Sequence, residues 1–162
     1  MSTFRFKFLK KKHLLQVMNI WPPLMGAGIR IKVKRPDLKE VLVEMKQRFW
    51  NTSFIDRHFG GSLYTMTDPF YMIMLMENLG RQYRVIDRQA EIKYLKAAKG
   101  KVWAKFVLTD ELISSIKEKL KVKNSSADIR LKIPIESEQG VVAEVTKVLF
   151  IKKIHSLEGI EE

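Results

Sequence analysis

Alternation of apolar and polar positions predicts two strands near the start of the chain. In residues 29–34 apolar side chains alternate with basic ones, and residues 41–46 repeat this period of two. The segment Arg35-Pro36-Asp37 between them is typical of a turn. The two runs therefore predict an antiparallel hairpin.

Three segments have helical character. Residues 8–20 and 110–121 carry apolar side chains at three-to-four spacing, and Asp110 is the expected N-cap of the second segment. Residues 63–79 are apolar on nearly every side, which is typical of a buried helix, and Gly80 is the expected end of that helix.

Four more strand-like runs follow, near residues 83–96, 101–109, 127–136 and 141–153. The order is strand, strand, buried helix and four strands. Six antiparallel strands that curl around one apolar helix bury it fully, so we expect an α+β fold of this kind. Residues 50–59 have no period and form a long connection, which makes them a candidate functional loop.

The length of 162 residues fits one domain, residues 1–162. We expect an N-terminal helix and a Pro/Gly loop in residues 1–28, a core in residues 29–154 and a tail in residues 155–162.

The chain has no cysteine, which excludes disulfides, thiolate zinc sites and cysteine nucleophiles. This favours a cytoplasmic location. His13, His58 and His155 lie in three different segments, so no metal site is expected. The longest strongly apolar run, residues 70–76, is far shorter than the ~20 residues of a membrane-spanning helix.

The formal charge of +12 favours polyanionic partners. The basic residues are spread along the chain without a nucleic-acid-binding motif, so no nucleic-acid partner is expected. Phe4, Phe6 and Phe8 alternate with basic residues, which leaves open contact with a membrane surface or an arm of a dimer.

Residues 58–64, His-Phe-Gly-Gly-Ser-Leu-Tyr, followed by Asp68, resemble the histidine-glycine-glycine signature of phenylacetyl-CoA thioesterases. These enzymes belong to the hot-dog-fold superfamily of acyl-CoA thioesterases. With Trp-Pro-Pro-Leu-Met-Gly-Ala-Gly at residues 21–28, the chain resembles most a thioesterase-like branch known as a domain of unknown function. The resemblance covers nearly the whole chain and implies a hot-dog fold, a six-stranded antiparallel sheet wrapped around a long buried helix.

The resemblance also implies site residues. The amide of Gly61, or of Gly60, polarises the thioester carbonyl, and Asp68 acts as base or nucleophile. His58 and Asn51 are further candidates. No cofactor is expected apart from the CoA carried by the substrate. The sequence departs from the commoner signature at Phe59, and Pro69 disfavours helical geometry at Asp68, which places this carboxylate at a kink.

Lys93, Lys96, Lys99 and Lys101 are the first candidates for binding the phosphates of CoA, although a solvated strand turn explains them equally well. We also expect a homodimer or a dimer of dimers. Gly61 and Asp68 are seven residues apart, which is ~10 Å along one helix and too far to act on one carbonyl. The resemblance likewise implies a site shared between subunits.

Each candidate has a structural alternative. Asp68 or Thr67 can cap a helix that begins at Pro69, and the glycine pair can form a tight turn. His58 can be a hydrogen-bonded structural histidine, and Asn51 can order the loop. Asp87 and Glu91, on the strand after the helix, can touch the substrate or can be surface residues that pair across a hairpin.

Three functions remain open. The first is a thioesterase that hydrolyses an acyl thioester, most simply an acyl-CoA. The second is a non-catalytic acyl-CoA-binding or acyl-binding protein, because a fold does not establish activity. The third is a hydratase or dehydratase that uses His58 and Asp68.

Overall fold

The computed structural model describes residues 11–122 and 126–154. Its strands form one antiparallel sheet in the order β1-β2-β4-β5-β6-β3. The strands are β1 (Ile29–Val33), β2 (Glu40–Lys46), β3 (Tyr83–Tyr94), β4 (Lys101–Val107), β5 (Ser126–Ser137) and β6 (Gly140–Lys153). The six predicted strands and the first hairpin are therefore confirmed.

The helices follow the predicted order with two differences. They are α1 (Lys11–Val17), the 3-10 helix η1 (Met18–Ile20), α2 (Pro22–Gly26), α3 (Gly60–Thr65), α4 (Phe70–Leu79) and α5 (Asp110–Val122). Helix α2 was not predicted. Pro22 and Pro23 occupy its first turn, where a missing N–H costs no helical hydrogen bond. Throughout residues 11–122 and 126–154, each helix is too short or too polar to cross a membrane.

Some of the predicted features lie outside the described residues. These are the first three residues of the leading helix, the aromatic and basic start of the chain, and the tail at residues 155–162.

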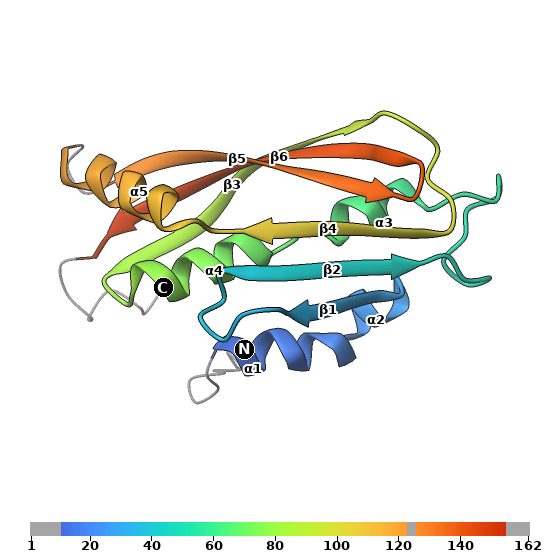
Figure 1. The fold of residues 1–162 in the computed structure, drawn as a ribbon, viewed down its shortest axis with the longest axis horizontal. Helices are drawn as coiled ribbons and strands as arrows, with labels where there is room; N and C mark the ends of the chain where they lie inside the picture. Colours follow the sequence, from blue (N-terminus) through green and yellow to red (C-terminus); the bar gives the residue numbers. More distant parts are fainter. Residues whose placement is uncertain (1–10, 123–125, 155–162) are drawn as a thin grey trace, which may run out of the picture.

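The sheet and the buried helix form the core of the hot-dog fold. Figure 1 shows α3 and α4 following one another along one side of the sheet. Most side chains of α4 are buried, and the inward positions of the strands, such as Val43, Ala104 and Val145, have no exposed surface. This apolar contact is the main source of stability, and it confirms the predicted fold class.

The second difference from the predicted helices, after the additional helix α2, is a break in the buried helix. Helix α3 ends at Thr65 and α4 begins at Phe70. Pro69 has no N–H to donate and disfavours helical geometry in the residue before it. Asp68 therefore lies in a short connection between two helices, at the kink that its proline neighbour predicts.

The caps differ from two expectations. Pro69 is the N-cap residue of α4, and no side chain in the described part of the chain caps it, so Asp68 does not act as the N-cap. Helix α5 begins at Asp110, and its cap is Thr109, whose Oγ1 accepts a hydrogen bond from the Leu112 amide at 3.2 Å. The expectation that Asp110 is the N-cap was wrong by one residue.

Candidate functional site

Asn51 orders the loop that leads to α3. Its Oδ1 accepts a hydrogen bond from the Arg48 amide at 2.7 Å. Its Nδ2 donates to the carbonyl oxygens of Ala27 at 2.9 Å and Lys46 at 3.0 Å. The side chain is buried, and both of its N–H groups already have acceptors. These contacts support the loop-ordering interpretation of Asn51.

His58 faces the turn before β4. Its amide donates to the Ala98 carbonyl at 2.9 Å, and its Nε2 lies 2.8 Å from the Gly100 carbonyl oxygen. Because a carbonyl only accepts, Nε2 carries the proton. Burial lowers the pKa of His58, and the bond to Gly100 only partly opposes this effect. Its Nδ1 is buried without a hydrogen-bond partner among the residues that the structure describes. This placement is that of a structural histidine.

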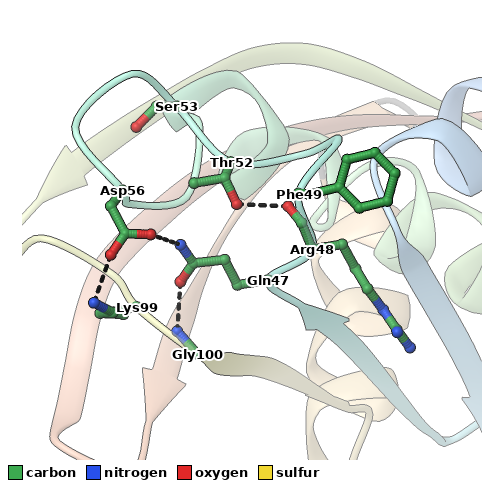
Figure 2. Close-up of a pocket in the computed structure, with 8 residues that line it drawn as sticks. All are labelled: Gln47, Arg48, Phe49, Thr52, Ser53, Asp56, Lys99 and Gly100. Carbon is green, nitrogen blue, oxygen red and sulfur yellow. Dashed lines mark hydrogen bonds and ion pairs between the residues drawn. The ribbon is translucent and has the colours of Figure 1, made fainter.

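A pocket of about 570 Å³ lies beside this turn, and its lining residues are drawn in Figure 2. They are Gln47, Arg48, Phe49, Thr52, Ser53, Asp56, Lys99 and Gly100. One Asp56 oxygen accepts from Gln47 at 3.1 Å, and the other pairs with Lys99 at 2.5 Å. Asp68 is not among the lining residues, so this pocket and that carboxylate are separate features.

The four lysines proposed to bind CoA phosphates each have a partner in the structure. The contacts are Lys93 with Glu91 (3.7 Å), Lys96 with the Gln139 carbonyl (3.4 Å), Lys99 with Asp56 (2.5 Å) and Lys101 with Glu44 (2.5 Å). Of the four, only Lys99 lines the pocket.

Gly60 and Gly61 are the first residues of α3, and aromatic rings lie against both. A Cβ on Gly60 would be 3.0 Å from Tyr94 Oη, which donates to the Gly60 carbonyl at 3.1 Å. A Cβ on Gly61 would be 2.7 Å from the ring of Phe59, the residue that departs from the commoner signature. Neither glycine has a positive φ, so the close approach of the rings, and not a left-handed backbone, favours glycine at these two positions.

Asp68 takes part in a charged cluster that joins the helix break to the sheet. Lys147 of β6 forms ion pairs with Asp68 and, at 3.2 Å, with Asp87 of β3. The Lys147 side chain is only 2% exposed, whereas Asp68 keeps 44% and Asp87 27%. The ammonium is therefore inside the protein, and the Asp68 carboxylate reaches the surface.

Burial and charge act against each other in this cluster. Burial alone would lower the pKa of Lys147, but the hydrogen bond and the negative charge of Asp68, together with Asp87, outweigh it and raise that pKa. Burial raises the pKa of Asp87, and the attraction of Lys147 only partly opposes it. The Lys147 nitrogen also lies 5.6 Å from the centroid of the Tyr64 ring. Lys147 thus remains a buried cation with two carboxylate partners.

Residues 10–151 match a protein family described as a domain of unknown function, DUF4442. The chain belongs to this family. A comparison with curated protein sequences gives no match.

Several solved structures share the fold of this DUF4442 chain at low sequence identity. A Pseudomonas aeruginosa protein described as a probable thioesterase is 19% identical, with a TM-score of 0.77 over 90% of this chain and 97% of that one. A thioesterase from Haemophilus influenzae is 13% identical, with a TM-score of 0.61 over 93% and 95%. A phenylacetic acid degradation protein from Thermus thermophilus, solved as a mutant, is 15% identical, with a TM-score of 0.52 over 80% and 97%.

Lys147 was missed as a site residue, although the sequence of this DUF4442 chain contains a signal. Ala143, Val145, Leu149 and Ile151 are buried at alternate positions of β6, and Lys147 occupies the inward position among them. A single lysine at a core-facing position of an apolar strand needs a buried partner. The same reasoning applies to Asp87, which follows the buried Val85 at the next inward position of β3.

Proposed function

We propose that this DUF4442 protein hydrolyses an acyl thioester, with acyl-CoA as its expected form, and that Asp68 carries the chemistry. The observation that carries the proposal is the placement of Asp68. Its carboxylate lies at the break between α3 and α4, keeps 44% exposure, and is held by the buried ammonium of Lys147. A fixed carboxylate that a substrate can reach suits a base or a nucleophile.

As a base, Asp68 removes a proton from water while the water oxygen attacks the thioester carbonyl carbon. The carbon–sulfur bond then breaks. The leaving thiolate takes up the proton from Asp68 and departs as the free thiol. In the alternative, the carboxylate attacks the carbonyl carbon, the carbon–sulfur bond breaks as the thiolate leaves, and water then hydrolyses the resulting anhydride. In either case negative charge develops on the carbonyl oxygen, and the amide of Gly61, or of Gly60, at the start of α3 would donate to it.

We propose that two subunits share this site. Gly61 is in the first turn of α3 and Asp68 lies beyond its end, and we expect the Asp68 carboxylate of one subunit to face the Gly61 amide of the other. Strand β3 is an edge of the sheet, and an edge of 12 residues is suited to pairing with a second copy. Apolar side chains are exposed on β3 and next to it: Ile86, Tyr94, Leu95 and, beside the Gly60 that Tyr94 contacts, Phe59. An active monomer at micromolar concentration in analytical ultracentrifugation would contradict the shared site.

The nucleotide end of CoA is proposed to lie near the pocket between the loop and the turn before β4. Arg48 and Lys99 line it and supply positive charge that phosphate groups require. Lys99 then exchanges its present partner, Asp56, for a phosphate oxygen.

A non-catalytic acyl-binding protein is the second candidate, because an ion-paired Asp68 can also serve a structural purpose. A hydratase or dehydratase is supported less well. It would need His58 beside the substrate, whereas this imidazole is buried against Gly100.

The proposal is tested by measuring hydrolysis of a panel of acyl-CoA thioesters, with release of the free thiol as the readout. The panel should vary chain length and include aromatic acyl groups such as phenylacetyl. We expect turnover of at least one member that grows linearly with enzyme concentration. Binding of acyl-CoA without thiol release would favour the acyl-binding alternative, and neither binding nor release would remove both.

A further inference from the structure

Lys147 is buried too deeply to touch a substrate, so any effect on chemistry must pass through its partners. Its side chain is 2% exposed and lies on the inward face of β6, between the buried residues Val145 and Leu149. A buried ammonium without a partner costs several kcal/mol. The position is therefore useful only if neighbouring carboxylates hold the charge.

Two carboxylates from different elements hold it. Asp68 comes from the break between α3 and α4, and Asp87 comes from β3, where the pairing with β6 shifts register between Asp87 and Gln89. The third group that faces the ammonium is the ring of Tyr64 from α3. Of the two carboxylates, Asp68 has the more exposed side chain, so we consider it the one that meets a substrate.

We propose that Lys147 and Asp87 are positioning residues for the chemistry at Asp68: Lys147 holds the Asp68 carboxylate, and Asp87 keeps the ammonium paired when Asp68 accepts a proton. This inference rests on the proposed thioesterase function. It adds two residues that act through Asp68 without contact with the substrate.

The physical argument concerns charge during one proton transfer. When Asp68 becomes neutral, Lys147 loses one counter-ion, and a buried cation left alone would oppose the transfer. Asp87, at 3.2 Å from the ammonium, remains as a partner. The negative charge of Asp68 is one of the causes that raise the pKa of Asp87, so its loss favours the ionised form of Asp87 at that moment.

Substitution of the two partners should therefore shift the acid limb of the pH–rate profile in opposite directions. In Lys147→Met the two carboxylates lose their cation, so protonation of the cluster becomes more favourable. The acid limb of the pH–rate profile should move up by about 1 pH unit or more. In Asp87→Asn, protonation of Asp68 would leave the ammonium of Lys147 with only a neutral amide beside it. Protonation is then less favourable, and the acid limb of the pH–rate profile should move to lower pH.

The experiment combines pH–rate profiles with NMR titration of the Asp68 side-chain carboxyl carbon in the full-length protein without substrate. Lys132→Met is the matched control, because Lys132 pairs with Glu144 at 3.2 Å on the exposed side of the neighbouring strand. We expect opposite shifts in Lys147→Met and Asp87→Asn and none in the control. If Lys147→Met does not fold, Asp87→Asn alone tests the inference: a shift of its acid limb to lower pH supports it, and no shift or a shift to higher pH overturns it.

The outcomes separate this inference from the proposed function. A wild-type protein without hydrolysis would overturn the function and with it the catalytic part of the inference, while the NMR titration would still test the electrostatic control of Asp68. Hydrolysis with unshifted titrations, or with shifts of the same sign in both variants, would overturn the inference and leave the function standing. Those results would assign Lys147 and Asp87 a purely structural role.

Discussion

The loop before α3 and the helix break after it both contain polar residues that the sequence marked as candidates, and they differ in what those residues contact. In the loop, Asn51 and His58 bond mainly to backbone carbonyl and amide groups. At the break, Asp68 contacts a charged side chain of the sheet, Lys147. Bonds to backbone groups hold a chain segment in place, whereas paired charges can respond to a proton. Under the proposed function, the loop gives the site its shape and the break supplies its chemistry.

Asn51→Ala should give the largest loss of stability among the polar residues of the loop and the break. It removes three hydrogen bonds to backbone groups. At ~1 kcal/mol of net stability for each bond, the free energy of unfolding should fall by ~3 kcal/mol. Urea denaturation measures this loss of stability. The control is Thr52→Ala, which removes a single exposed hydrogen bond, from Thr52 to the Arg48 carbonyl. Native stability combined with loss of hydrolysis would instead place Asn51 in the site.

His58 should make stability depend on pH below neutrality. Burial lowers its pKa from the ordinary value of 6.5, so the unfolded chain binds the proton more readily than the folded one. The stability that the neutral imidazole contributes is complete above pH 6.5 and is lost as the pH falls below it. Melting temperatures of the wild type and of His58→Gln, which keeps a donor for Gly100, should converge as the pH is lowered. A gap that widens in favour of the wild type would contradict this sign.

Alanine at the two glycines of α3 should give the smallest change in stability. Alanine favours a helix by up to ~1 kcal/mol over glycine, which offsets the displacement of a neighbouring ring. Gly61→Ala should be the milder variant, because the exposed Phe59 ring can turn away, whereas Gly60→Ala disturbs the bond from Tyr94. Thermal melts should show changes within ~1 kcal/mol. If Gly61→Ala loses hydrolysis at native stability, the start of α3 belongs with Asp68 in the chemistry.

The strands could be predicted from the sequence because their signal is local. Alternation along residues 29–34 and 41–46 requires only neighbouring positions, and both runs form strands. The break at Pro69 has a local cause as well. The partners of Lys147 lie 79 and 60 residues away, and no local pattern identifies them. Sequence reasoning could select Asp68, but its cation depends on how the break packs against β6.

The central claim is that Asp68 performs the chemistry, and Asp68→Asn tests it most directly. The change keeps the size of the side chain and removes its charge, while Lys147 retains Asp87 as a partner. The matched control is Asp128→Asn, which removes an exposed carboxylate that pairs with Arg88 at 2.8 Å. Thiol release from the best acyl-CoA should fall by ~100-fold or more in Asp68→Asn, with binding and melting temperature retained, and should stay near the wild-type rate in Asp128→Asn. Hydrolysis by Asp68→Asn at the wild-type rate would contradict the account.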